Sequence, residues 1–222
     1  MTAKILAVLH EKGGVGKTTV AMTLAASMAE QGHSVMVADC DFQGSALAWA
    51  NAAPAEKPFP ATVLDFSGMG QHLHEEIYRH IETYDFIVLD CPPSVHSLSN
   101  HSAVLISDLV IVPFSPSPTD FWSLHGLKPL ILGAKAVNQD VQAVLLPNRL
   151  MRTSLSSSIL DTLSQFDMPI LQSRLSSRVA YQEAAISGGS LMSLGHSAKV
   201  AAKEMNALCA EVLTLLGLAH HD

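Results

Sequence analysis

A glycine-rich turn near the N-terminus constrains the fold more than any other feature of the sequence. The apolar run 4–10 (KILAVLH) predicts a buried strand, and an Ala-, Met- and Leu-rich stretch over 17–31 predicts a helix. Between them lies GGVGKTT, whose glycines allow a tight turn that brings successive N–H groups to face one point. The order of strand, glycine-rich loop and helix favours an α/β fold with an anion-binding loop.

Further apolar runs continue the alternation of strands and helices. Four more strands are predicted, over 34–41, 85–92, 108–114 and 141–147. Continuous Val, Ile and Leu runs are typical of strands that are buried on both faces. We therefore predict one domain over residues 1–222, a doubly wound, mostly parallel sheet with helices on both faces, one of them over roughly 119–137. The Pro-rich stretches 51–62 and 113–121 are expected to be surface loops.

Composition argues against several classes of protein. Hydrophobic residues make up 48% of the chain and charged residues 15%, which is enough apolar material for a full core. No apolar run has the length of a membrane span, and the N-terminus does not resemble a secretory signal. Cys40, Cys91 and Cys209 have no CxxC spacing, so the sequence indicates neither a disulfide framework nor a zinc site. We expect a cytoplasmic protein.

Polar residues at the loop and at two strand ends predict phosphate and magnesium chemistry. Lys17 can reach the β- and γ-phosphates of a nucleotide, and the Thr18 hydroxyl can coordinate Mg²⁺. Asp90 ends the run FIVLD, where a second magnesium ligand is needed. Asp39 and Asp41 end the run VADCD, so alternation would turn both carboxylates toward one crevice, one for a magnesium-bound water and one for the attacking water. Either aspartate could instead cap a helix or form a turn.

Four motifs follow one another along the chain: KGGVGKTT, VMVADCDFQGS, FIVLDCPPS and VIVPFSPSPTDFW. Together with SRVAYQEAAISGGSL, they resemble the ParA branch of the deviant Walker ATPases, in particular small ParA proteins that lack an N-terminal DNA-reading domain. The resemblance implies a P-loop ATPase with a deviant Walker A motif, with ATP and Mg²⁺ as cofactors. It also implies a homodimer in the ATP state, in which the early loop lysine, here Lys12, reaches the partner's ATP and offsets the charge of transfer.

The resemblance assigns roles to individual positions. Phosphate binding is implied for Gly13, Gly14, Val15, Gly16, Lys17, Thr18 and Thr19. The implied metal ligands are Thr18 directly, and Asp39 and Asp90 through water. The implied catalytic residues are Lys12, Lys17 and Asp41, the last as the acid that positions water. Asn148 matches a position that often recognises adenine, although an Asn after a strand is also a common turn former.

Three positions depart from the family's pattern. Phe42 stands where the first switch usually has proline, and His10 stands where asparagine is common before the loop lysine. Cys91 follows Asp90 where small residues are common. None of these changes removes a required charge, so ATP binding is still expected, while the hydrolysis rate and the mobility of the switch could differ.

The net charge of −7 conceals an asymmetry along the chain. Residues 149–203 hold six basic and three acidic side chains, a net charge of +3, which leaves −10 for the rest. The candidate DNA-binding residues are Arg149, Arg152, Arg174, Arg178, Lys199 and Lys203, of which Arg152 and Arg178 match the family's DNA-facing positions. The resemblance then implies a partitioning ATPase that binds DNA without sequence preference in its ATP state, when it would associate with the nucleoid. A ParB-like or other adaptor on a plasmid, chromosome or protein cargo would stimulate hydrolysis.

Two other functions use a similar loop. A MinD-like membrane-positioning ATPase needs a C-terminal amphipathic helix with basic flanks, but the charges of the tail 203–222 are mainly acidic, so we expect a final helix packed on the core and no stable membrane association. An electron-transferring iron–sulfur ATPase needs two cluster cysteines in each subunit, whereas Cys40 and Cys91 lie within the switch motifs. The histidines of 71–80 (QHLHEEIYRH) are expected on an exposed helix face rather than at a metal.

Overall fold

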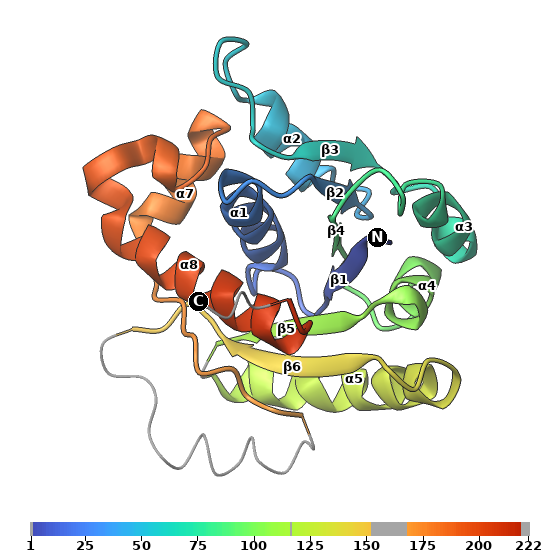
Figure 1. Cartoon of the computed structure of the whole chain (residues 1–222). Helices are drawn as coiled ribbons and strands as arrows, with labels where there is room; N and C mark the ends of the chain where they lie inside the picture. The colour runs from blue at the N-terminus through green and yellow to red at the C-terminus, as the bar shows by residue number, and fades with distance from the viewer. Residues whose placement is uncertain (1, 116, 152–167, 219–222) are drawn as a thin grey trace.

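One parallel sheet organises the fold (Figure 1). The computed structural model describes residues 2–115, 117–151 and 168–218. In this part of the chain six strands lie in the spatial order β3-β2-β4-β1-β5-β6, and each neighbouring pair is parallel. The strands are β1 (Lys4–Val8), β2 (Val35–Asp39), β3 (Thr62–Asp65), β4 (Phe86–Asp90), β5 (Leu109–Phe114) and β6 (Gln142–Pro147). The predicted α/β fold with a parallel, doubly wound sheet is confirmed.

Helices cover both faces of the sheet (Figure 1). On one face α1, α2, α7 and α8 share an apolar core with Leu6 and Val8 of β1, and on the other face α3, α4 and α5 share a core with Ile5 and Ala7. Successive side chains of a strand point to opposite faces, so one apolar strand supplies both cores. The helices are α1 (Lys17–Glu30), α2 (Ser45–Asn51), α3 (Leu73–Tyr78), α4 (Leu98–Ile106), α5 (Pro118–Val137), α7 (Val179–Ser187) and α8 (Lys199–Leu215), with 3-10 segments η1 (Gly70–His72) and η3 (Met192–Ala198).

The five predicted strands are present, each slightly shorter than predicted, but strand β3 was missed. β3 lies at the edge of the sheet beside β2, and its four residues are exposed or half-buried, so its sequence contains no continuous apolar run. The prediction of a surface loop over 113–121 was wrong for most of that range. β5 extends to Phe114 and α5 begins at Pro118, where the Ser117 side chain accepts a hydrogen bond from the Asp120 N–H and caps the helix. Asp120 is only 2% exposed.

The last described helix, α8, packs on the core. Ala201, Met205, Leu208 and Val212 lie on one side of it and are buried in the same cluster as α1. This spacing of three and four residues is that of an amphipathic helix on a globular domain, as predicted. Within residues 2–115, 117–151 and 168–218 no helix is both long and apolar enough to cross a membrane.

Candidate functional site

The predicted site residues meet at the carboxyl ends of β1, β2 and β4. In the parallel register Val8 pairs with Asp90, and Asp90 pairs with Asp39. The glycine-rich loop follows β1 directly and leads into α1. Strand pairing therefore places the two aspartates side by side next to the loop, at the edge of the sheet where open α/β folds bind ligands.

The loop has the backbone that phosphate binding requires. Gly14 and Gly16 adopt positive φ angles of 79° and 96°, which other residues rarely adopt. Within the described residues, the N–H groups of Val15 and Gly16 make no hydrogen bond to a protein acceptor. Backbone N–H groups without acceptors, directly before the N-terminus of a helix, form a place for an anion.

Lys17 lies at the mouth of this loop and is 7% exposed. Its ammonium donates a hydrogen bond to the Lys12 carbonyl oxygen, 3.2 Å away, so it folds back across the loop. Burial lowers the pKa of Lys17, and the nearby carboxylate of Asp90 acts in the opposite direction. A partly desolvated ammonium with a weak neutral partner is well placed to exchange that partner for a phosphate oxygen.

Asp90 is the clearest sign of an absent ligand. It is 1% exposed, and neither of its carboxylate oxygens has a hydrogen-bond partner among the described residues. Burial raises the pKa of Asp90 to about 7; the Thr18 hydroxyl lies near enough to act against this, without a hydrogen bond of normal geometry. A buried carboxylate without a partner beside a hydroxyl suits Mg²⁺, so these residues fit the ion. No group of three or more His, Cys, Asp or Glu among the described residues could hold a metal, so Mg²⁺ here would draw most of its ligands from phosphate and water.

The carboxylates of Asp39 and Asp41 accept hydrogen bonds from nearby backbone N–H groups. β2 ends at Asp39, so the alternation that was expected to align both carboxylates does not extend to Asp41. Asp39 accepts hydrogen bonds from the N–H groups of Asp41, at 3.3 Å, and of Leu47, at 2.9 Å, in the first turn of α2. The half-buried Asp41 accepts one from the Gln43 N–H at 3.1 Å. The alternative role of helix cap and turn former thus applies to these carboxylates in the free chain.

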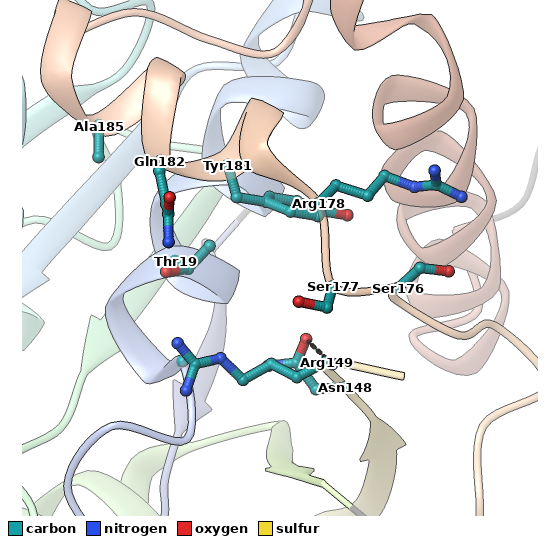
Figure 2. A pocket seen from close by; sticks show the side chains of 10 residues that line it. Thr19, Asn148, Arg149, Ser176, Ser177, Arg178, Tyr181, Gln182 and Ala185 are labelled. Atoms are coloured by element: carbon teal, nitrogen blue, oxygen red, sulfur yellow. Dashed lines mark hydrogen bonds between the residues drawn. The ribbon is translucent and has the colours of Figure 1, made fainter. Parts of the chain in front are cut away.

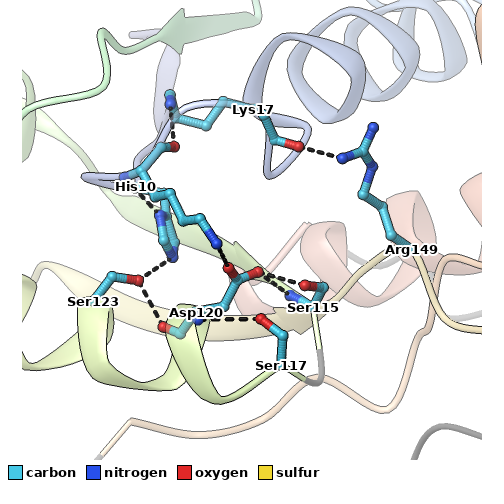
Figure 3. A network of polar contacts seen from close by, with 9 residues as sticks. His10, Lys17, Ser115, Ser117, Asp120, Ser123 and Arg149 are labelled. Carbon is cyan, nitrogen blue, oxygen red and sulfur yellow. Dashed lines mark hydrogen bonds and ion pairs between the residues drawn. The ribbon is translucent and has the colours of Figure 1, made fainter.

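Lys12 is paired within its own chain (Figure 3). Its ammonium forms an ion pair with Asp120, which also accepts hydrogen bonds from the N–H and the hydroxyl of Ser115. Burial raises the pKa of Asp120, but the hydrogen bonds from Lys12 and Ser115 outweigh this and hold it below its ordinary value. No motif predicted Asp120; the only signal is an acidic residue after Ser-Pro-Thr at the start of a helix.

His10 joins the beginning of the loop to α5. It is fully buried, its Nδ1 accepts the Lys12 N–H at 3.0 Å, and its Nε2 lies 3.2 Å from the Ser123 hydroxyl. Since Nδ1 accepts, the proton of the neutral ring is assigned to Nε2. Burial lowers the pKa of His10 to about 4, which keeps the ring neutral at physiological pH. This departure from the family's pattern therefore has a defined structural role.

Asn148 and Arg149, predicted for adenine and for DNA, both contact the phosphate loop. The Asn148 side-chain amide donates to the Val15 carbonyl at 2.8 Å, and the Arg149 guanidinium donates to the Gly14 carbonyl. They line a pocket of about 150 Å³ beside the loop (Figure 2). The other residues that line it are Gly16, Thr19, Ser176, Ser177, Arg178, Tyr181, Gln182 and Ala185. This pocket is large enough for part of a nucleoside next to a loop-bound phosphate.

Of the remaining candidate DNA-binding residues, Arg178 lines the pocket beside the loop, whereas Arg174, Lys199 and Lys203 do not. The Arg178 guanidinium donates from Nε to both carboxylate oxygens of Glu204, at 3.2 Å each, and from Nη2 to Oε1 at 2.6 Å, so Glu204 offsets its charge. Arg174, Lys199 and Lys203 are exposed. Lys199 and Lys203 border an open depression of about 650 Å³ on η3 and α8. Arg152 lies outside the described residues.

All three cysteines are free and buried. Cys40 and Cys91 follow the paired strand ends at Asp39 and Asp90, and Cys209 lies within α8. Burial raises the pKa of each thiol, which opposes formation of the thiolates that bind metals.

Comparison with known proteins matches nearly the whole chain. The sequence model of the "CobQ/CobB/MinD/ParA nucleotide binding domain" family matches residues 6–216. The "Maintenance of carboxysome distribution protein A" of Halothiobacillus neapolitanus is 29% identical over 211 residues, which cover 94% of this chain and 95% of that protein.

Two solved structures share the fold. The ATP complex of a Cyanothece McdA variant has a TM-score of 0.73 at 16% identity, covering 100% of this chain and 99% of that one. The septum site-determining protein MinD of Pyrococcus horikoshii, complexed with Mg-ADP, has a TM-score of 0.72 at 21% identity and covers 99% and 100%. Because the family model matches residues 6–216 of the 222, the chain belongs to the CobQ/CobB/MinD/ParA family and is an ATPase of the ParA/MinD/Soj type.

Proposed function

We propose that the chain is a positioning ATPase of the ParA kind, which binds Mg-ATP at the glycine-rich loop and distributes a cargo in the cell. The observation that carries the proposal is a set of groups at the loop for which the described residues provide no hydrogen-bond partner: the N–H groups of Val15 and Gly16 and both oxygens of the buried Asp90. Together they offer an anion site beside a cation site, which is what a magnesium-bound phosphate needs. The chain is similar over nearly its full length to a carboxysome distribution protein, and this similarity supports a protein cargo.

The proposed chemistry uses the chain's own groups as follows. The loop N–H groups and Lys17 bind the phosphates, while Thr18 and Asp90 would hold Mg²⁺, Asp90 through water. The ion supplies charge neutralisation at the phosphate oxygens when it is bound. Asp41 accepts a hydrogen bond from the attacking water and orients it. Asp39 positions Asp41 by accepting a hydrogen bond from its N–H group. A contact of Asp39 with a magnesium-bound water is its secondary role.

Dimerisation around the nucleotide completes the proposed mechanism. Lys12 would leave Asp120 and contact the phosphates bound by the partner subunit, where it offsets charge that develops during transfer. The Lys12 ammonium would contact Asp120 in the free chain and the partner's nucleotide in the dimer, so closure of the dimer depends on the nucleotide. Phe42 lies in the turn that contains Asp41 and is 81% exposed, so it belongs to the surface that would meet the second subunit.

Non-specific DNA is the proposed track for the dimer. Arg174, Lys199 and Lys203 are the residues whose exposure favours phosphate contacts, and pairing two subunits doubles their number. Arg178 contributes less, since Glu204 offsets its charge. The protein would then be cytoplasmic, nucleoid-associated in the ATP state and released when an adaptor on the cargo stimulates hydrolysis. Met192 and Val200, both more than half exposed beside these lysines, favour a membrane surface as the second candidate.

The test is binding of the Asp41→Ala protein, which should hold ATP without hydrolysing it, to random-sequence DNA and to anionic liposomes. Each assay is run with ATP and with ADP at low and moderate salt, with Lys17→Ala as the nucleotide-free control. We expect salt-sensitive DNA binding with ATP alone, weakened when Lys199 and Lys203 are changed to Glu. Liposome binding without DNA binding would move the chain to the membrane-positioning function. Wild-type hydrolysis by Asp41→Ala would contradict the role of Asp41.

A further inference from the structure

Two consecutive residues after β6 hold two consecutive carbonyl groups of the phosphate loop. Asn148 donates its side-chain N–H to the Val15 carbonyl at 2.8 Å. Arg149 donates to the Gly14 carbonyl, and Figure 3 shows this contact of Arg149. Asn148 is itself fixed, because its own N–H donates to the Phe114 carbonyl at 2.8 Å and its Oδ1 accepts the Arg149 N–H at 2.9 Å. The loop is therefore tied to the end of β6 at two adjacent points.

These contacts decide which way the loop's N–H groups point. In a trans peptide the C=O and N–H groups point in opposite directions. The Gly14 carbonyl shares a peptide group with the Val15 N–H, and the Val15 carbonyl shares one with the Gly16 N–H. Holding both carbonyls toward β6 turns both N–H groups away from it. In the described structure these two N–H groups have no protein acceptor.

Two further observations indicate that the arrangement is closely fitted. A Cβ atom at Gly16 would lie 2.7 Å from Asn148 Nδ2, so the asparagine requires glycine at this point of the loop. Arg149 has a φ of 56°, the only positive value for a residue other than glycine in the described part of the chain. Arginine rarely adopts this backbone, and here it accompanies the contact between the guanidinium and Gly14.

We propose that Asn148 and Arg149 are positioning residues that orient the phosphate loop, so that the N–H groups of Val15 and Gly16 converge on the nucleotide's phosphates. This inference rests on the proposed function, since it assumes that the loop binds phosphate. It replaces base recognition by Asn148 and DNA contact by Arg149 as their main roles. The base is left to the other residues of the adjoining pocket, such as Ser177 and Gln182 (Figure 2).

The decisive experiment measures affinity for ligands with and without a base. Asn148→Ala and Arg149→Gly are titrated calorimetrically with Mg-ATP, Mg-GTP and magnesium tripolyphosphate, beside wild type and the exposed-lysine control Lys135→Ala. Glycine adopts a positive φ without strain, so Arg149→Gly removes the side chain with its guanidinium and keeps the backbone conformation accessible. We expect each variant to lose about fivefold to tenfold in affinity for all three ligands, the effect of one lost hydrogen bond.

Other results would overturn the inference in distinguishable ways. A loss confined to Mg-ATP in Asn148→Ala would assign that residue to the base. Unchanged nucleotide affinity with weakened DNA binding in Arg149→Gly would return that residue to the DNA surface. If wild type binds all three ligands and the variants match it, only the positioning role is wrong, whereas a wild type that binds none would overturn the proposed function as well. Should Asn148→Ala fail to fold, Asn148→Leu, closer in volume, tests the same lost donor.

Discussion

The nucleotide site and the face formed by α7 and α8 both contain ionic groups, but they satisfy them in opposite ways. At the site, Asp90 is buried, and neither of its oxygens accepts a hydrogen bond within the part of the chain that the structure describes. On the other face, Glu204 accepts hydrogen bonds from the Arg178 guanidinium and from the N–H and hydroxyl of Ser176. A buried polar group without a partner costs stability, whereas a paired one does not. The carboxylate of Asp90 is therefore available to a ligand, whereas the paired carboxylate of Glu204 stabilises the fold.

The largest effect that would break this comparison is expected for Asp90→Asn. Because burial raises the pKa of Asp90 to about 7, the folded chain disfavours the charged carboxylate, and a neutral amide should increase the free energy of unfolding by about 1–3 kcal/mol at pH 8. The same change should weaken Mg-nucleotide binding by about 100-fold, since it removes the carboxylate that would hold a magnesium-bound water. Urea unfolding and calorimetric titration measure the two effects.

The control for that prediction is Asp39→Asn. Burial raises the pKa of Asp39 as well, but its two oxygens accept hydrogen bonds from the N–H groups of Asp41 and Leu47, and an amide can keep only one of these acceptors, so Asp39→Asn should lower stability by about 1 kcal/mol. A lower stability for both variants would show that Asp90 holds the fold in the way Asp39 does, and the comparison would fail.

The next effect is expected for Lys12→Ala. Lys12 is paired with Asp120 in the free chain, and in the proposed dimer it contacts the partner's phosphates. The variant should keep nucleotide binding within about threefold but lose ATP-dependent dimerisation by about 100-fold, because a desolvated charge pair at an interface is removed. Sedimentation velocity with ATP and with ADP measures this. Dimerisation equal to that of Lys135→Ala would show that Lys12 acts only within its own chain.

The smallest effect is expected for Glu204→Gln on the α7–α8 face. Burial raises the pKa of Glu204, but the hydrogen bonds from Arg178 and Ser176 outweigh it and hold the pKa below the ordinary value of 4.5. The carboxylate therefore stabilises the fold above pH 4.5, and this contribution is lost as the pH falls through the lowered pKa. We expect a loss of about 1 kcal/mol at pH 7, since the pair is partly exposed to solvent.

Chemical unfolding of wild type and Glu204→Gln at pH 7 and at pH 3 tests the sign. The difference should be present at pH 7 and smaller at pH 3. A difference that grows with acid would mean that Glu204 does not act as a charged acceptor.

The sequence alone predicted the sheet and the phosphate loop, and physical reasons explain what it missed. Continuous apolar runs and the glycine spacing are local signals, so β1, β2, β4, β5, β6 and the loop before α1 were found. β3 lies at the sheet edge with exposed and half-buried side chains, so it leaves no such run. That residues 1–222 form one domain stays a prediction.

Side-chain partners at the site were less predictable, because they depend on contacts between distant segments. Lys12 pairs with Asp120 and Asn148 contacts Val15 over more than a hundred residues of sequence, and no spacing rule anticipates either pair. β2 is short and ends at Asp39, so the Asp39 carboxylate accepts hydrogen bonds from the N–H groups of the next turn, which the motif did not indicate. The roles of the individual site residues stay predictions until the variants are measured.

The turn that follows β2 has a mechanical consequence. Asp39 grips the N–H groups of Asp41 and Leu47 at once, and the Gly44 N–H bonds back to the Asp41 carbonyl at 2.9 Å. These hydrogen bonds hold the segment 41–47 together as one compact turn. Phe42 directly follows Asp41 in this turn, so a movement of Asp41 also moves Phe42, whose ring extends into solvent. The shape of the molecular surface at Phe42 therefore depends on the position of Asp41, whose carboxylate lies next to the phosphate loop.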